Sequence, residues 1–69
     1  MRLVDAMCRA CRRAKGMMPG SSRTKSISVL GWAHEDQYQV ALYDRKSLMP
    51  IYEGRLRYAV MWAQQKGLA

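Results

Sequence analysis

Apolar side chains in the first 16 residues recur at the spacing of an amphipathic helix. At 100° per residue, one arc of about 100° holds Leu3, Met7, Ala10, Cys11 and Ala14, while the arginines fall on the opposite side. Gly16 follows this run in a position where helices commonly stop. The pattern therefore predicts a basic amphipathic helix over residues 1–16.

The helical period ends in the following segment, M-M-P-G-S-S-R-T, which covers residues 17–24. Pro19 and Gly20 disfavour both helix and sheet, and the two serines offer local side-chain hydrogen bonds. We therefore predict a linker here.

The period changes to two in residues 25–44, where two runs of alternating apolar and polar residues flank the polar segment His34–Asp36. The apolar members are Ile27 and Val29 in the first run and Tyr38, Val40 and Leu42 in the second. Two such runs around a short polar connection predict a β-hairpin over residues 25–44. A helix over residues 35–45 is the alternative, because several of its side chains also fit helical spacing. That alternative would make the chain all-α with three helices.

Helical signals return in residues 47–66. Ser47 can cap the first turn, Pro50 lies where a missing N–H is harmless, and Gly67 can end the helix. A rival interpretation uses Glu53-Gly54 as the turn of a second hairpin. The favoured arrangement is an α+β fold, a helix–β-hairpin–helix in a single small domain over residues 1–69.

The predicted C-terminal helix has more apolar circumference than a surface helix needs. Beside its main apolar stripe runs a second stripe formed by Ile51, Arg55, Tyr58 and Trp62. A chain of 69 residues buries only about 60% of its extended surface, so a partner chain would help to stabilise it. We therefore predict that this second stripe is a protein interface and that the chain forms a homodimer.

Positive charge is concentrated at the start of the chain. The net charge is +7, and the first 25 residues hold seven of the twelve basic residues against one acid, Asp5. The predicted nucleic-acid or anion-binding residues are Arg2, Arg9, Arg12, Arg13, Lys15, Arg23 and Lys25. Guanidinium groups pair with phosphate in a bidentate geometry, so a located positive field of this kind indicates an anionic partner.

Catalytic or metal chemistry has little support in the sequence. A tetrahedral zinc site needs four ligands, and the chain offers Cys8, Cys11 and a single histidine, His34. Only a site shared by two chains could be complete, and both thiols are expected in mid-helix, away from the position of a redox C-x-x-C. The histidine has no identifiable catalytic partner. The sequence predicts a protein without cofactor, metal or enzymatic activity.

Three functions remain in order of preference. The first is a small nucleic-acid-binding regulatory or accessory protein, binding DNA or RNA, that grips phosphates with its Arg-rich helix and loop. The second is a protein-binding modulator or inhibitor that docks on an acidic surface of a larger protein. The third is a peripheral membrane binder, for which alanines make the apolar helix face weak, so we expect no stable membrane association. The absence of a secretory signal predicts a cytoplasmic location.

Overall fold

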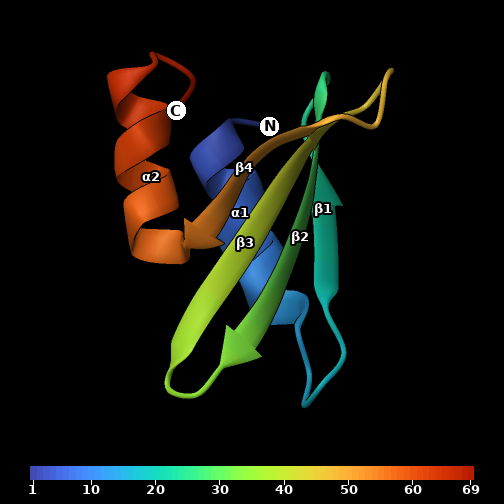
Figure 1. Cartoon of the computed structure of the whole chain (residues 1–69), viewed down its shortest axis with the longest axis vertical. Helices are drawn as coiled ribbons and strands as arrows, with labels where there is room; N and C mark the ends of the chain where they lie inside the picture. Colours follow the sequence, from blue (N-terminus) through green and yellow to red (C-terminus); the bar gives the residue numbers. More distant parts are fainter.

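The computed structural model describes all 69 residues as one α+β domain with two helices and a four-stranded sheet (Figure 1). The elements are α1 (Leu3–Arg13), β1 (Gly20–Arg23), β2 (Ile27–His34), β3 (Gln37–Asp44), β4 (Pro50–Arg55) and α2 (Leu56–Gln65). The strands form an antiparallel meander in the order β1-β2-β3-β4. The predicted α+β class is confirmed, and the all-α alternative is wrong.

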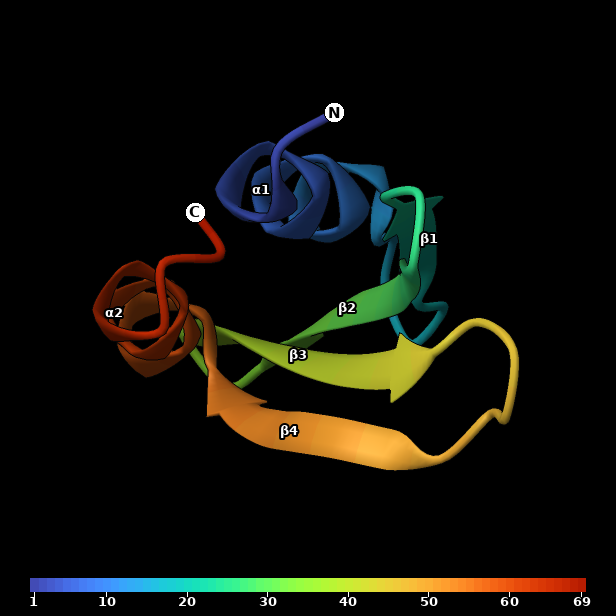
Figure 2. The same ribbon diagram turned by 90° about the horizontal axis from the view of Figure 1, so that it is seen from above.

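Both helices lie on the same face of the sheet, which curls around them (Figure 2). Helix α1 packs against β1 and β2, and α2 lies beside the other end of the sheet, against β3 and β4. The opposite side of the sheet carries no helix, and we call it the open face. Neither helix is long and apolar enough to cross a membrane.

The hydrophobic core lies between the helices and the covered face of the sheet. It comprises Leu3, Ala6, Met7, Ala10 and Cys11 of α1, Ile27, Val29, Val40 and Leu42 of the central strands, and Ala59 and Ala63 of α2. Four of these eleven side chains are alanines, so the elements approach one another closely. Tyr52 and Trp62 pack at the margin of this core, with their ring centroids 4.8 Å apart.

Two glycines opposite each other in the sheet let α1 lie directly on the strands. Gly20 of β1 pairs with Gly31 of β2. A Cβ on Gly31 would lie 2.8 Å from the Cys11 nitrogen, and a Cβ on Gly20 would collide with the carbonyl oxygen of Ala10. The helix backbone therefore occupies the space in which side chains of these strands would stand.

The predicted hairpin is confirmed as β2 and β3, joined by the two residues Glu35 and Asp36. The alternative helix over residues 35–45 is wrong. Strand β3 lies in the middle of the sheet, and its residues Val40, Ala41 and Leu42 are all buried. Such a strand needs a partner on each side, and the predicted two-stranded hairpin would have left one of its edges unpaired.

The sheet gains its two outer strands from segments that the sequence assigns elsewhere. The predicted linker over 17–24 contains β1, which has no apolar residue and forms by pairing with the edge of β2. The predicted helix over 47–66 is wrong in its first part, because residues 50–55 form β4 along β3 and only Leu56–Gln65 are helical. Glu53 and Gly54 lie inside β4, so they are not the turn of a second hairpin. The predicted helix over 1–16 is correct in type but ends at Arg13.

Candidate functional site

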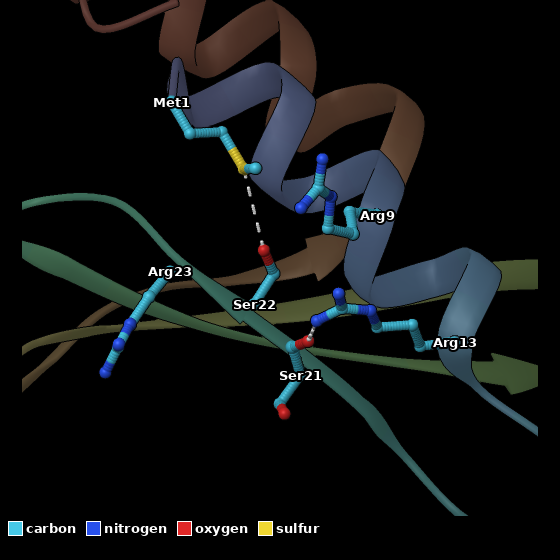
Figure 3. A pocket seen from close by; sticks show the side chains of 6 residues that line it. All are labelled: Met1, Arg9, Arg13, Ser21, Ser22 and Arg23. Carbon is cyan, nitrogen blue, oxygen red and sulfur yellow. Dashed lines mark hydrogen bonds between the residues drawn. The ribbon is translucent and has the colours of Figure 1, made fainter.

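Three arginines gather around one open pocket of about 480 Å³ between α1 and β1 (Figure 3). We call it the Arg pocket, and its lining residues are Met1, Arg9, Arg13, Ser21, Ser22 and Arg23. All three arginines are exposed, and no carboxylate is among the lining residues. The local field is therefore positive and is not neutralised from within the pocket.

The helical period and the edge strand together position these arginines. Arg9 and Arg13 are four residues apart, so both project from the same side of α1. The Arg13 Nη1 donates a hydrogen bond of 3.0 Å to the backbone carbonyl oxygen of Ser21, which joins α1 to β1. Arg23 extends from β1 away from the helix (Figure 3). The close approach of α1 at Gly20 keeps helix and strand near enough to share the pocket.

The pocket offers many hydrogen-bond donors and few acceptors. A guanidinium group has five N–H donors in a planar fork, and the contact with Ser21 uses only one of those of Arg13. The hydroxyl of Ser22 lies 3.7 Å from the sulfur of Met1, a weak acceptor. Such a set of donors suits the oxygens of a phosphate or another oxyanion.

The other predicted anion-binding residues do not join this pocket. The Arg2 Nε donates a 2.9 Å hydrogen bond to the carbonyl oxygen of Ala69. Arg12 is exposed on α1, and Lys15 lies in the connection that follows it, where Lys15 and Met18 form an isolated bridge. Of the seven residues predicted from the sequence, Arg9, Arg13 and Arg23 are brought together.

Lys25 belongs to a second basic region, in the turn that follows the C-terminal end of β1. A pocket of about 260 Å³ there is lined by Lys25, Ser26, Asp44, Arg45 and Lys46. The Arg45 Nη1 donates to the carbonyl oxygens of Thr24 (3.0 Å) and Lys25 (3.2 Å), so this side chain holds the β1–β2 turn. Asp44 partly balances the positive charge, which distinguishes this region from the Arg pocket.

Sequence reasoning missed Ser21 and Ser22 as lining residues, since they sit in the predicted linker. The signal that could have found them is the G-S-S-R order itself. Once a strand is recognised there, Ser21 and Arg23 must share one face and Ser22 the other.

The four residues of the predicted protein interface do not form one helical stripe. Ile51 and Arg55 lie in β4, and Tyr58 and Trp62 lie in α2. Trp62 is half-buried against Tyr52, whereas Tyr58 is exposed and lies 5.9 Å from the Arg55 guanidinium carbon. The stripe was predicted on the assumption that residues 47–66 form one helix, and they do not, so these four side chains do not share one helix face.

Both cysteines lie in α1, and each is a free thiol. Cys11 is buried in the core, and desolvation by burial, with a smaller contribution from Cys8, raises its pKa to about 11. Cys8 is half-buried. A thiol with so high a pKa is a poor nucleophile and a poor metal ligand at neutral pH. No three His, Cys, Asp or Glu side chains are grouped in a way that could hold a metal ion.

Comparison with known proteins gives no match among family models, curated proteins or solved structures.

Proposed function

We propose that this chain is a non-enzymatic nucleic-acid-binding protein that holds backbone phosphates in the Arg pocket. The observation that carries the proposal is that Arg9, Arg13 and Arg23, from two different elements, line one pocket that has no carboxylate. Each planar guanidinium group can donate two parallel hydrogen bonds to the oxygens of one phosphate, whereas a lysine ammonium acts as a point charge. A pocket lined by arginines therefore suits a phosphate.

The charge outside the pocket favours a polymeric anion over a small one. The chain carries a net charge of +7, and exposed Arg12 continues the positive surface along α1. A small anion would use only the pocket, whereas a polynucleotide can contact successive basic groups along the helix and the edge strand. Electrostatic attraction of this kind gives binding that does not depend on sequence and falls steeply with salt.

The number of arginines in the pocket sets the expected salt dependence. If three phosphates are neutralised, the slope of log K against log salt should be about −2.7 for duplex DNA and about −2 for a single strand. The seven basic residues of the sequence prediction would give a slope of about −6 on a duplex. The measured slope therefore reports how many of them take part.

The test is titration of fluorescent oligonucleotides across a salt series with the wild type and a double variant, Arg9→Gln with Arg13→Gln. Losing two exposed ion pairs should weaken binding by about 5- to 30-fold at low salt and reduce the slope by one to two. The matched control is Arg57→Gln with Lys66→Gln, which removes the same charge from α2 and from the residue that follows it. Thermal melting checks that each variant is folded.

The proposal fails if the wild type shows no salt-dependent binding, or if the control pair weakens binding as much as the pocket pair. The first outcome would favour docking on an acidic protein surface. The predicted homodimer is a separate question, which a size-exclusion mass measurement on the same samples addresses.

A further inference from the structure

The open face of the sheet carries an apolar and aromatic surface that no helix covers. Because paired residues of adjacent antiparallel strands point to the same side, the register fixes which side chains lie there. Trp32 pairs with Gln39, Leu30 with Ala41, and Ser28 with Tyr43. Neighbouring residues along a strand point to opposite sides of the sheet. Since the neighbours Val29 and Leu42 are in the core, these three pairs lie on the open face.

Large side chains on this face remain accessible. Leu30 is 37% and Ile51 39% exposed, and Trp32 and Tyr43 are half-buried. The small Ala41, which is only 3% exposed, lies between larger neighbours. The row of Trp32 and the row of Tyr43 are four positions apart along neighbouring strands, so the backbone positions of the two residues are roughly 14 Å apart. The pair between these two rows, Leu30 and Ala41, is apolar.

This surface is continuous with the Arg pocket. Ser21 pairs with Leu30 and Arg23 pairs with Ser28, so both residues of β1 stand on the open face. The same two residues line the Arg pocket. A row therefore runs from Arg23 through Ser28 to Tyr43, and the edge strand β1 is where the basic pocket and the aromatic surface meet.

We propose that the open face binds the unpaired bases of a single-stranded polynucleotide whose phosphates lie in the Arg pocket. This inference rests on the proposed function and names its substrate class. Trp32 and Tyr43 each stack on a base, because every base presents a π-face to an aromatic ring. Base pairs in a duplex are stacked on one another and cannot offer their faces, so the surface selects single strands.

Polar side chains beside Trp32 fit the edges of a stacked base. A hollow of about 380 Å³ on this side of the sheet is lined by Trp32, His34, Gln39, Glu53 and Gly54. The amide of Gln39 can donate and accept, and the carboxylate of Glu53 can accept from an amino group of a base. Neither stacking nor phosphate pairing uses the 2′-hydroxyl group, so DNA and RNA strands should bind with similar affinity.

A second copy of this chain is a poorer occupant of the same surface. Two copies, each with a net charge of +7, would meet with Arg23 at one edge and Arg55 at the other edge of each sheet. Bringing like charges together opposes association, whereas a polyanion neutralises them.

The experiment compares the affinity of the protein for a 12-nucleotide DNA strand, the RNA strand of the same sequence and the DNA duplex. We expect the two single strands to bind within a few fold of each other and more tightly than the duplex. Trp32→Ala and Tyr43→Ala should each weaken single-strand binding by about 5- to 100-fold, with an unchanged salt slope. Trp32→Phe and Tyr43→Phe should retain most of the affinity, and Trp62→Phe, on the covered side, should retain all of it.

A spectroscopic measurement makes the test independent of how well the alanine variants fold. Trp62→Phe leaves Trp32 as the single tryptophan. Stacking on a base should quench its emission when a single strand is added at low salt, and the duplex should quench it much less.

The outcomes separate the two proposals. If the duplex binds as tightly as the strands, or Trp32 emission does not change while the Arg9→Gln, Arg13→Gln variant still loses affinity, the open-face inference is overturned and phosphate binding stands. If no oligonucleotide binds in a salt-dependent way, both proposals fail.

Discussion

Replacing Gly31 by alanine should push α1 away from the sheet. The new Cβ would lie 2.8 Å from the Cys11 nitrogen and 3.0 Å from the carbonyl carbon of Ala10. Ordinary contacts between such atoms are about 3.5–4.0 Å, so the helix must rise by roughly 0.5–1 Å. These two atoms belong to the helix backbone, so a rotamer change of the Cys11 side chain, whose sulfur would also lie 3.0 Å away, cannot by itself relieve the contact.

The cost follows from what α1 contributes to the core. The helix supplies five buried side chains, from Leu3 to Cys11, and a gap of 0.5–1 Å forfeits about a quarter to a half of each dispersion contact. Overpacking of a well-packed site costs about 1–3 kcal/mol, and alanine in a strand recovers about 0.5 kcal/mol relative to glycine. We expect Gly31→Ala to lower the free energy of unfolding by the difference of these two terms, about 0.5–2.5 kcal/mol. A domain of this size has roughly 3–10 kcal/mol in total.

Urea unfolding followed by circular dichroism measures this loss, and with a slope of about 1 kcal/mol per M the midpoint should fall by about 0.5–2.5 M. Thermal melting should show a decrease of the melting temperature by roughly 2–20 °C, since 1 kcal/mol corresponds to about 4–8 °C in a domain of this size. Gly54→Ala is the matched control. It changes a glycine in the same row of the sheet, where the new Cβ would meet the movable Tyr52 ring at 3.3 Å and no helix backbone. Equal effects of the two substitutions, or a fully stable Gly31→Ala, would refute the close-approach explanation.

Three further predictions concern single residues. Leu48 has a φ of 62° and is exposed, so Leu48→Gly should stabilise the fold by about 0.5–1 kcal/mol in urea unfolding, while Leu48→Ala should bring no gain. In the folded protein a thiol reagent should modify the half-buried Cys8 rapidly and the buried Cys11 only after unfolding. Because burial raises the pKa of Cys11 from 9.0 to about 11, the unfolded state ionises first, and stability should fall as pH rises through that range. Cys11→Ala should remove this alkaline loss. Hydrogen bonds from the backbone of Ser47 and Lys46 lower the pKa of Asp44, so the stability that this carboxylate contributes is present above its ordinary pKa of 3.8 and is lost as pH falls below that value. Asp44→Ala should reduce the acid dependence of the melting temperature, and an unaltered profile would contradict this.

The elements that could be predicted from the sequence are those with one buried and one exposed side. In α1 the apolar residues and the arginines separate cleanly at helical spacing, and at the start of β2 Ser28 stands between the buried Ile27 and Val29. Periodicity was misleading where both faces of an element are mixed. In β4 the covered side has Tyr52 and Gly54 while the open face has Ile51 and Glu53, so no alternation of apolar and polar residues is visible.

Strand β1 could not be predicted because its cause is not local. G-S-S-R has weak strand propensity, and it is extended because β2 offers it an edge and because glycine at position 20 leaves room for α1. The candidate site shares this limit. That Arg9 and Arg13 share one side of α1 follows from the helical period alone, but the place of Arg23 at the same pocket depends on the register of β1 against β2.

The meander topology also determines how the molecule opens. Every strand pairs only with its neighbours along the chain, so the sheet can assemble by closing short loops outward from the turn at Glu35 and Asp36. Strand β1 has four residues and one partner, so its amides should exchange with solvent sooner than those of β2 and β3. A strand of nucleic acid that bridges α1 and β1 would retard that exchange, and binding would then complete the order of the sheet at its weakest edge.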